Sequence, residues 1–576
     1  MRKLFRELWA FKLPVLGVVV TVLVGVAATL GLPTYLSDII NQGIPSGDMG
    51  MILKTGLIML GLALLAMAAN ILTGLFSARI SLGLGRNLRS KVFSKVQRFS
   101  QAEFDRFSTA SLITRTNNDI TQIQNFIMMF LRIILMAPVM CVAGVLLAYG
   151  KSPSMSSVLL VSVPVMAVLV ILVARFALPL SKRMQKKIDA INLVMREKLS
   201  GIRVIRAFGT EDYESRRFQR ANAELMENSL KMQRIMAALG PGLMLVLNFT
   251  TVALLWMGGS QVPSGAVLTG DIIAVIQYVM QIMLSVTMLS MIFVMYPRAS
   301  ASAERVLEVL ETEPSITDPA NPKDNPALRG YLTFKNVTFA FPGAQEPAIA
   351  DISFEAKPGE TTAIIGSTGS GKSALVGLIP RFYDVQSGEI LVDGINVKDY
   401  DRKVLRRKIG YVPQKALLFS GDIQGNIRFG NPAATDEQVQ EAAAVAQAAD
   451  FIEAKAEGYQ APIAQGGGNV SGGQKQRLSI ARAVVRDPEI YIFDDSFSAL
   501  DFKTDAALRR ALGKRTAQAT VLIVAQRVST IKDADRILVL NEGRLAGMGT
   551  HQELLETCET YREIVESQLS KEEMGA

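Results

Sequence analysis

The sequence predicts an α-helical membrane domain, with six transmembrane helices and long cytosolic extensions, followed by an α/β domain. Three observations lead to this fold class. The chain has 576 residues, which is too long for a single hydrophobic core. Hydrophobic residues make up 49% of it and the mean hydropathy is +0.27. The long apolar stretches lie in the first half, whereas the second half has the pattern of an ordinary soluble domain.

Six stretches of the first half are long enough to cross a bilayer, which takes about 20 mostly apolar residues each. They lie near 14–38, 52–77, 119–149, 154–180, 236–262 and 269–297. Three of their connections are short and almost free of Lys and Arg, and the others are long and basic. The positive-inside rule then places both termini in the cytoplasm of a multi-pass protein of the cytoplasmic membrane, meaning an inner or plasma membrane.

The long basic connections have apolar residues at three- and four-residue spacing, so we expect the spanning helices to continue far into the cytosol. Each pair would close on a short turn and contact a cytosolic domain, and a solvated helical stalk is the alternative. The first 12 residues fit two interpretations. They form either a short helix in the membrane interface or a solvated start that continues into the first span.

The net charge of +9 does not indicate nucleic acid, because the basic residues lie beside apolar spans and not along one soluble face. Cys141 and Cys558 belong to different compartments, so no disulfide is expected. Polar residues within the spans are expected to face a cavity or another helix: Asn70, Arg132, Arg175, Asn248, Gln277 and Gln281. Methionines in the third and sixth spans suit either varied apolar ligands or ordinary packing.

These patterns predict a transmembrane domain over residues 1–311, a linker rich in Pro, Asp and Asn over 312–328, and a nucleotide-binding domain over 329–576. The buried strand ETTAIIG runs into GSTGSGKS, a phosphate-binding loop with the pattern G-x-x-x-x-G-K-[ST]. Its backbone N–H groups would hold phosphate oxygens, Lys372 would reach the outer phosphates and Ser373 would bind Mg²⁺. The loop residues are Gly366, Ser367, Thr368, Gly369, Ser370, Gly371, Lys372, Ser373 and Ala374.

Further segments complete a nucleotide site. The strand IYIF ends at Asp494, which would hold Mg²⁺ through water, and Asp495 follows at the position of a general base. Gln414 follows another short strand and would contact the metal, and Phe341 would stack on adenine. The segment VSGGQ begins a helix and provides an anion site without a lysine: Ser471, Gly472, Gly473 and Gln474. Such a site suits nucleotide held by another subunit.

These segments, in this order behind six spans, resemble an ABC transporter half-unit of the exporter type over essentially the whole chain. The resemblance implies two halves that close head to tail on two ATP molecules with Mg²⁺. Each ATP lies between the phosphate loop of one half and the signature VSGGQ of the other. It also implies an ATP-binding-cassette fold with a helical subdomain, a D-loop role for Asp501, and coupling through REKLSGIRVIRAFGTEDYE.

The chain departs from that family at two positions. Fully active members carry glutamate where this chain has Asp495 and histidine where it has Gln526, and the one histidine, His551, suits a capped surface helix. Gln526 cannot shuttle a proton at neutral pH. The combination resembles the degenerate-site subunit of heterodimeric bacterial multidrug exporters. The partner would be a homologous half-transporter that supplies the glutamate and the histidine.

The resemblance leaves other functions open. A homodimeric exporter would carry Asp495 and Gln526 in both of its sites. An importer of metal chelates built on the same fold would share every nucleotide motif. A sensory subunit would let a competent partner transport after Lys372 is neutralised. The substrate is expected to be a small amphipathic compound in contact with membrane lipids, and drugs, lipids and peptides all remain candidates.

Overall fold

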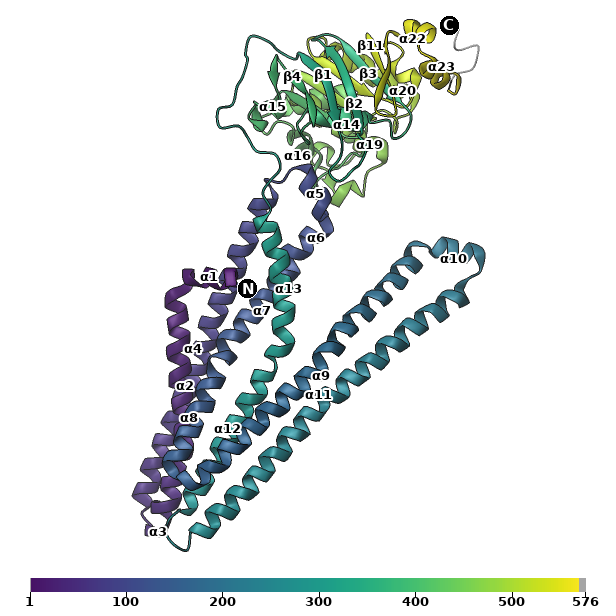
Figure 1. Ribbon diagram of the computed structural model, residues 1–576. Helices are drawn as coiled ribbons and strands as arrows, with labels where there is room; N and C mark the ends of the chain where they lie inside the picture. Colours follow the sequence, from purple (N-terminus) through teal and green to yellow (C-terminus); the bar gives the residue numbers. More distant parts are fainter. Residues whose placement is uncertain (1, 569–576) are drawn as a thin grey trace. The chain divides into compact units, whose positions relative to one another are not determined.

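The contacts within the chain divide it into two compact units in the computed structural model, which describes residues 2–568 (Figure 1). The first unit consists of the chain up to Gln97 together with Thr109–Thr312. The second consists of Arg98–Ser108 together with the chain from Glu313 onward. A short segment from the middle of the helical half therefore belongs to the α/β unit.

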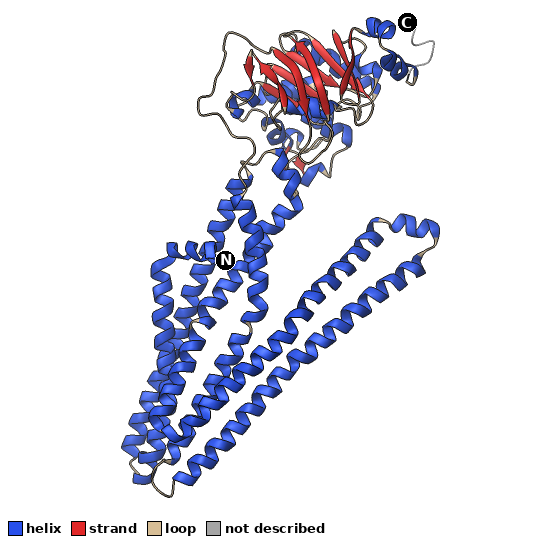
Figure 2. Ribbon diagram, in the orientation of Figure 1, coloured by secondary structure: helices blue, strands red, loops and turns tan. Residues whose placement is uncertain are grey.

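The first unit is built from helices (Figure 2). They are α1 (Arg2–Glu7), α2 (Lys12–Asp38), α3 (Ile44–Ser46), α4 (Met49–Val96), α6 (Thr109–Thr114), α7 (Ile120–Met129), α8 (Met136–Lys151), α9 (Pro153–Ser200), α10 (Ile202–Phe208), α11 (Glu211–Gln261), α12 (Thr269–Ser290) and α13 (Ile292–Glu311). A 3₁₀ turn, η1 (Leu8–Phe11), and three π-helical turns, η2 (Ile39–Gly43), η3 (Arg115–Asp119) and η4 (Phe130–Ile134), connect some of them.

Six helical segments within residues 2–568 are long and apolar enough to cross a membrane, which confirms the predicted set of six apolar helices. They are Phe5–Ser46, Met49–Val96, Thr109–Lys151, Pro153–Ser200, Glu211–Gln261 and Thr269–Glu311. Local capping explains where two of them begin. The Asp48 carboxylate accepts the Met51 N–H at 3.0 Å, and the Ser152 hydroxyl accepts the Met155 N–H at 3.4 Å.

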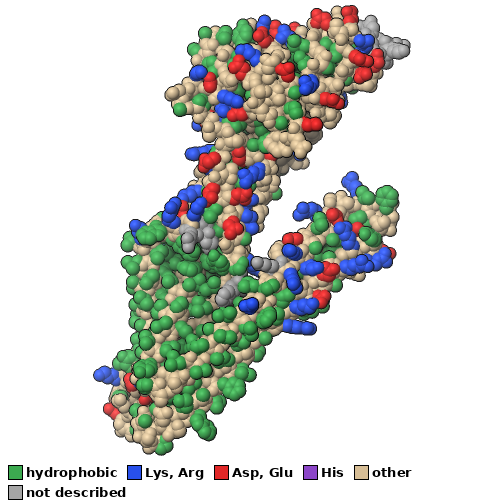
Figure 3. Space-filling model, viewed as in Figure 1, with side chains coloured by type: hydrophobic (Ala, Val, Ile, Leu, Met, Phe, Trp, Pro, Cys, Tyr) green, Lys and Arg blue, Asp and Glu red, His purple; other side chains and the backbone are tan. Residues whose placement is uncertain are grey.

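The predicted extensions beyond the spans are helical. The 48 residues of α4 and the 48 of α9 each extend about 72 Å, more than twice the thickness of a hydrocarbon core. Helices α9 and α11 run side by side as an arm, and α10 joins them at its tip (Figure 1). Lys and Arg side chains gather along the half of this arm nearest its tip, whereas hydrophobic side chains cover the bundle around α2 and α8 (Figure 3).

The N-terminal residues form a separate short helix, α1, that turns away from α2 (Figure 1). A break lies at Phe11, whose backbone leaves the helical region with φ −115° and ψ 34°. Two ion pairs hold the segment against other helices of the same unit. Lys3 pairs with Glu311 at 2.5 Å, and Glu7 pairs with Lys91 at 2.7 Å.

A cluster of polar side chains joins α2, α8 and α12 at the end of the bundle opposite to α10. The Lys151 ammonium lies 3.3 Å from the Asp38 carboxylate and 3.4 Å from that of Asp271. Ser37 and Asn41 donate hydrogen bonds to the same Asp271 oxygen, at 2.7 and 3.3 Å. Asp271 is only 13% exposed, so most of its interactions are with protein groups.

Replacing Lys151 with Met is expected to lower the thermal unfolding midpoint of the purified chain in detergent. The substitution leaves the half-buried Asp271 carboxylate without its cation, which costs about 1–3 kcal/mol. The exposed Lys54 on α4 provides the matched control, because Lys54→Met removes a lysine outside the cluster. Equal midpoints for the two variants would show that the cluster does not stabilise this end of the bundle.

The second unit contains three sheets (Figure 2). Its strands are β1 (Leu332–Phe339), β2 (Ile349–Ala356), β3 (Thr361–Gly366), β4 (Ser387–Val392), β5 (Ile395–Asn396), β6 (Ile409–Val412), β7 (Gly421–Asp422), β8 (Pro462–Ile463), β9 (Ile490–Asp494), β10 (Thr520–Val524), β11 (Arg536–Asn541) and β12 (Arg544–Gly549). The central sheet has the order β12-β11-β3-β10-β9-β6 and is parallel except for β12. A second sheet has the order β2-β1-β4-β5, and β7 pairs with β8.

Helices complete this unit. They are α5 (Gln101–Phe107), α14 (Lys372–Leu378), α15 (Arg402–Arg407), α16 (Ile423–Arg428), α17 (Asp436–Val445), α18 (Ala449–Glu453), α19 (Gly472–Val484), α20 (Phe502–Arg515), α21 (Val528–Ile531), α22 (His551–Thr557) and α23 (Glu559–Glu566), with 3₁₀ turns η5 (Gly458–Gln460) and η6 (Gln465–Gly467).

Both faces of the central sheet are buried, as parallel sheets require. Along β9, Ile490 and Ile492 join the apolar core shared with β1, β2 and α14. Tyr491 and Phe493 join the other core, which α16, α17, α19 and α20 complete. The strand is thus buried on both faces and ends at Asp494, and β10 separates it from β3, the strand that leads into the phosphate loop.

Candidate nucleotide site

The predicted phosphate loop lies between β3 and α14, as its mechanism requires. Ser367, Thr368 and Gly369 are exposed, whereas Ser370 is buried and its N–H bonds the Ser367 carbonyl at 3.2 Å. Gly371 has φ +94°, in the left-handed region that favours glycine. The following residues, Lys372, Ser373 and Ala374, form the first turn of α14.

Two glycines of the loop have no room for a side chain. A Cβ at Gly366 would lie 2.1 Å from the Leu540 carbonyl oxygen, and one at Gly371 would lie 2.5 Å from that of Ala348. Gly369, by contrast, has nothing within 4 Å of a Cβ, so its small size is not required by the protein's own packing. An open backbone at that point lets a phosphate approach the N–H groups closely, and the loop therefore fits the phosphates of ATP.

Lys372 lies folded into the loop. Its ammonium donates to the carbonyl oxygens of Gly366 and Ser367, at 2.8 and 2.7 Å. Burial lowers the pKa of this lysine, and the nearby carboxylates of Asp495 and Asp494 oppose that shift. A phosphate in the loop would give the ammonium a second anionic partner, so the residue is well placed to hold ATP.

The Asp494 carboxylate accepts hydrogen bonds from two hydroxyl groups. Ser373 donates to its Oδ1 at 2.9 Å, and Tyr411 donates to its Oδ2 at 3.3 Å. Burial raises the pKa of Asp494, while the two hydroxyl groups lower it. Adjacent hydroxyl and carboxylate oxygens are the ligands that Mg²⁺ takes, and a bound cation would favour the ionised carboxylate. The predicted pair Ser373 and Asp494 therefore fits a magnesium ion.

Asp495, at the position predicted for the base, is held by two amide side chains. Gln526 donates to its Oδ2 at 2.8 Å, and Gln414 donates to the same oxygen at 3.2 Å. The residue has φ +48°, a left-handed conformation that a non-glycine residue rarely adopts. Two predicted site residues thus bond one oxygen atom of a third, although 81 positions separate Gln414 from Asp495.

Phe341 lies just beyond β1, with 41% of its surface exposed. Its ring meets that of Tyr383 edge-on, with 5.4 Å between centroids and an angle of 90°. The exposed part of Phe341 is available to an adenine ring, and the stacking itself stays a prediction. The Tyr383 hydroxyl donates to the Asp105 carboxylate of α5 at 2.6 Å, and burial, followed by this bond, raises the pKa of the phenol.

The aromatic pair therefore connects the expected adenine position with α5, a helix that the chain contributes from between its second and third spans. Ser100 and Glu103 form a capping box that begins α5. Their side chains also bond the Ser315 hydroxyl and N–H, at 2.8 and 3.1 Å. Sequence patterns did not reveal Tyr383 or Asp105, because the two residues lie 278 positions apart.

Replacing Tyr383 with Phe is expected to speed amide hydrogen exchange in α5 by about five-fold, since one hydrogen bond contributes about 1 kcal/mol. ATP binding should stay within about two-fold, because the ring against Phe341 is kept. Hydrogen-exchange mass spectrometry of the peptide covering 101–107 measures the effect. Asp105→Asn, which keeps an acceptor oxygen, is the control. Unchanged exchange in Tyr383→Phe would show that the bond does not hold the helix.

The signature residues begin α19. The Ser471 hydroxyl accepts the Gln474 N–H at 3.3 Å, and the Gln474 side chain accepts the Ser471 N–H at 3.0 Å. This capping box fixes the first turn. A Cβ at Gly473 would lie 3.2 Å from the Ala499 carbonyl, whereas one at Gly472 would have nothing within 4 Å. The exposed backbone at Gly472 is therefore open to a molecule outside this chain.

Asp501 and the residues that flank His551 cap helices. The Asp501 carboxylate accepts the Thr504 N–H at 2.9 Å and begins α20, and this backbone hydrogen bond lowers the pKa of Asp501. Thr550 and Glu553 form the capping box predicted around His551. His551 itself bonds the Tyr561 hydroxyl at 2.7 Å. The one histidine of the chain is thus part of a surface helix, as expected.

Both parts of the chain match known protein families. Residues 15–286 match the family described as the ABC transporter transmembrane region, and residues 349–498 match the family described as ABC transporter. An uncharacterized ABC transporter ATP-binding protein of Mycobacterium tuberculosis is 43% identical over 95% of this chain and 94% of its own length. The ATP-dependent lipid A-core flippase of Hahella chejuensis is 32% identical over 98% of this chain and 96% of its own length.

A solved structure has a similar fold throughout. The structure of a bacterial Atm1-family ABC exporter with ATP bound superposes with a TM-score of 0.81 at 25% identity, covering 97% of this chain and 98% of that one. Half-transporters of this kind dimerise. The helical membrane unit, the ATP-binding loop and these relatives together identify the chain as a member of the ABC transporter family, an ATP-driven exporter-type half-unit with its transmembrane and nucleotide-binding regions in one polypeptide.

Proposed function

We propose that this chain is one subunit of a heterodimeric exporter that moves amphipathic compounds out across the cytoplasmic membrane. Its own ATP site turns over slowly, and its signature VSGGQ completes the hydrolytic site of a homologous partner. Both termini lie in the cytoplasm, with the domain boundaries and site residues given above. The observation that carries the proposal is the Asp495 carboxylate, one of whose oxygens accepts hydrogen bonds from both Gln414 and Gln526.

That arrangement explains slow turnover in chemical terms. A general base must reach the proton of the attacking water, and its help contributes roughly 10²–10⁴-fold to the rate. The Asp495 side chain is one methylene shorter than glutamate, and an oxygen with two amide donors is less available to take a proton. Gln526 has no group that exchanges a proton at neutral pH. The site is therefore suited to hold ATP more than to hydrolyse it.

Binding of ATP and Mg²⁺ is expected to survive these departures. Lys372 and the loop N–H groups would hold the phosphates, Phe341 would stack on adenine, and Ser373, Asp494 and Gln414 would hold the ion. The bound Mg²⁺ supplies charge neutralisation for the phosphate oxygens. The chain's own residues orient the nucleotide and leave its outer phosphate in front of the Asp495 carboxylate.

Two surfaces of the chain fit a partner. The first is the open backbone at Gly472, which suits nucleotide held by another subunit. The second is the tip of the α9–α11 arm around α10, where large apolar side chains are exposed. Phe208 is 77% exposed, Tyr213 62% and Val204 60%. Apolar side chains gathered on a cytosolic tip favour contact with another protein, and we assign that contact to the partner's nucleotide-binding domain.

The experiment compares two substitutions in the purified complex of this chain with its partner. Asp495→Asn is expected to leave at least half of the ATPase activity, because the slow site contributes little to it. Replacing the partner's catalytic glutamate with Gln is expected to reduce the activity about 100-fold. Equal losses from the two substitutions would contradict the proposal and would favour two equivalent sites, as in a homodimer.

A further inference from the structure

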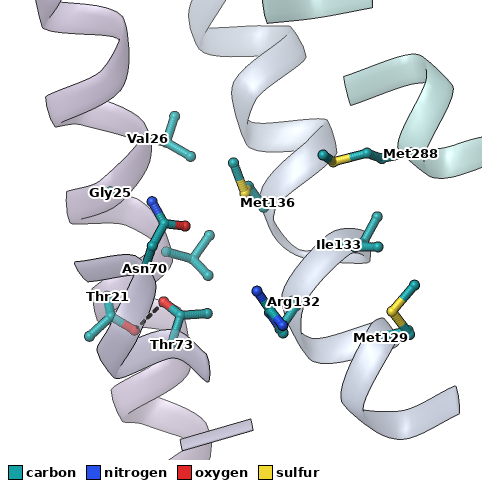
Figure 4. Close-up of a pocket in the computed structure, with 11 residues that line it drawn as sticks. Thr21, Gly25, Val26, Asn70, Thr73, Met129, Arg132, Ile133, Met136 and Met288 are labelled. Atoms are coloured by element: carbon teal, nitrogen blue, oxygen red, sulfur yellow. Dashed lines mark hydrogen bonds between the residues drawn. The ribbon is translucent and has the colours of Figure 1, made fainter. Parts of the chain in front are cut away.

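An exposed arginine, Arg132, lines a cavity of the membrane unit and has no anionic partner among residues 2–568. The cavity has a volume of about 280 Å³ and lies between α2, α4, α12 and the helix that runs from α7 through η4 to α8 (Figure 4). The residues that line it are Thr21, Val22, Gly25, Val26, Asn70, Thr73, Met129, Arg132, Ile133, Met136 and Met288. None of these residues is acidic.

Close packing of small residues shapes one wall. A Cβ at Gly25 of α2 would lie 3.4 Å from the Cβ of Ala69 on α4, so the two helices approach closely there. Next to this contact, Thr73 donates to the Thr21 hydroxyl at 2.8 Å, and Thr21 donates to the Gly17 carbonyl at 2.8 Å. Both hydroxyl protons are thus used within the protein, and the wall is fixed in place.

Arg132 projects from the opposite wall toward Asn70 and Thr73 (Figure 4). It lies within the π-helical turn η4, and π turns in long helices are frequent at functional sites. One extra residue in the turn rotates the following segment by about 100° relative to a continuous α-helix. Among the residues that the structure describes, no hydrogen bond or ion pair accompanies the Arg132 guanidinium.

Arginines that line a cavity at the end of a membrane span, without an acidic partner, often belong to a substrate or ion pathway. A guanidinium carries a positive charge and offers five N–H donors in a planar fork. Carboxylate and phosphate groups match this fork through two parallel hydrogen bonds. A cationic group would be repelled by the same charge, so the cavity discriminates by the sign of its ligand.

The remaining surface of the cavity is apolar and adaptable. Met129, Met136 and Met288 face it together with Val22 and Ile133. A much smaller crevice of about 10 Å³ lies beside it and shares Met129, Ile133 and Met288. Flexible thioether side chains accommodate alkyl chains of varied shape. The cavity thus offers one charged end and an apolar continuation, which is the pattern of an amphiphile.

The depth of Arg132 matches the position of an amphiphile's head group. The residue lies 19 positions before Lys151, the end of the same helical segment, which corresponds to about 28 Å along the axis. A hydrocarbon core is about 30 Å thick. With the proposed topology, Lys151 lies at the outer face, so Arg132 lies at the level of the inner head groups.

We propose that this cavity binds the anionic head group of an amphipathic substrate, a phosphate or a carboxylate, through Arg132. The inference rests on the proposed export function and names its substrate class. The anionic amphiphile enters from the inner leaflet, its head group pairs with Arg132, and its alkyl chain lies along Met129, Met136 and Met288. A membrane phospholipid and a free amphiphile share this chemistry, and the test distinguishes them.

The test measures equilibrium binding without nucleotide, in the full-length chain reconstituted in nanodiscs of phosphatidylcholine. The probes are radiolabelled dodecyl phosphate and dodecyltrimethylammonium, which share an alkyl chain and differ in head-group charge. Arg132→Met is expected to weaken dodecyl phosphate binding at least 10-fold and to leave dodecyltrimethylammonium binding unchanged or tighter. Arg132→Lys keeps the charge but loses the planar fork, so its affinity for dodecyl phosphate should lie between those of the original chain and Arg132→Met.

The matched control is Arg175→Met, which removes another arginine from a span. Arg175 is exposed on α9 and is not among the residues that line this cavity. Equal dodecyl phosphate affinity in Arg132→Met and the original chain would overturn the proposal, as would a preference of the original chain for dodecyltrimethylammonium. ATP binding by each variant verifies that it is folded. If ATP binding is retained while dodecyl phosphate binding does not depend on Arg132, the head-group proposal fails and the function proposed for the nucleotide site stands.

A second arm identifies the source of the ligand. Adding phosphatidylglycerol to the nanodiscs should displace dodecyl phosphate if the natural occupant is an anionic phospholipid. Unchanged binding would assign the cavity to an amphiphile that is not a membrane lipid. Both results support an anionic head-group site, provided that Arg132→Met removes the binding.

Discussion

Replacing Asp495 with Glu and Gln526 with His together is expected to raise ATP hydrolysis at this chain's own site by about 10- to 100-fold. The added methylene carries the carboxylate toward the outer phosphate and away from the Gln414 amide, which donates to it at 3.2 Å, and the second substitution removes the Gln526 amide, which donates at 2.8 Å. The imidazole supplies a group that exchanges protons near neutral pH. The measurement is the rate of phosphate release by the chain purified alone, at saturating ATP and Mg²⁺.

The matched control is Asp495→Asn combined with Gln526→His. It introduces the same imidazole but removes the carboxylate, so we expect no gain in phosphate release. Nucleotide binding, measured in the same samples, corrects for differences in occupancy. A restored pair that hydrolyses ATP no faster than the original chain would show that the slow site has a cause other than these two residues.

The second large effect concerns the signature. In the complex with the partner, Gly472→Asp is expected to reduce ATP hydrolysis about 1000-fold. A carboxylate there would lie within about 4 Å of nucleotide phosphate, and two like charges at that distance repel with about 4 kcal/mol at an effective dielectric constant of 20. The chain's own fold tolerates the change, since nothing lies within 4 Å of a Cβ at Gly472 and acidic residues suit the first turn of a helix.

A matched glycine provides the control for this substitution. Gly513 on α20 is exposed and also has nothing within 4 Å of a Cβ, so Gly513→Asp adds the same charge away from the signature. The control complex should keep its activity, and ATP binding to this chain's own loop should be unchanged in both variants. Full activity in the Gly472→Asp complex would show that this signature does not contact the partner's nucleotide.

Local sequence patterns were enough to predict the elements of the site. The strand Ile490–Asp494 is buried throughout, and its apolar run ending in an acidic residue indicates this directly. The phosphate loop and the capping boxes at Ser471 and Thr550 are formed by residues within a few positions of one another. Short-range spacing predicts such features because the interacting groups are fixed by one helical turn or one strand.

Contacts between distant residues were not predictable in the same way. Gln414 and Gln526 bond the same oxygen of Asp495 only because the central sheet brings β6, β9 and β10 together. The Tyr383–Asp105 bond joins two parts of the chain that are 278 positions apart. No periodic pattern within a single sequence indicates which distant residues form hydrogen bonds with each other. These pairs are therefore seen only in the tertiary fold.

The polar residues of the spans illustrate the same limit. From the sequence, we predict the same environment for Arg132 and Arg175, namely a cavity or another helix. In the fold, Arg132 and Asn70 line the 280 Å³ cavity and Arg175 of α9 does not, although all three residues are exposed. The difference arises from the π turn at Phe130–Ile134 and from the close approach of α2 and α4 at Gly25. Neither feature has a clear signature in the sequence.

The central claim is that this chain holds ATP without hydrolysing it at a useful rate. The most direct test measures Mg²⁺-dependent ATPase activity and nucleotide binding together, in one sample of the chain purified alone in lipid. We expect saturable ATP binding by the chain alone, with ATP turnover at least about 100-fold below that of the complex with its partner. Brisk turnover by the chain alone would contradict this claim, because Asp495 would then suffice as a base and the homodimer would explain the activity.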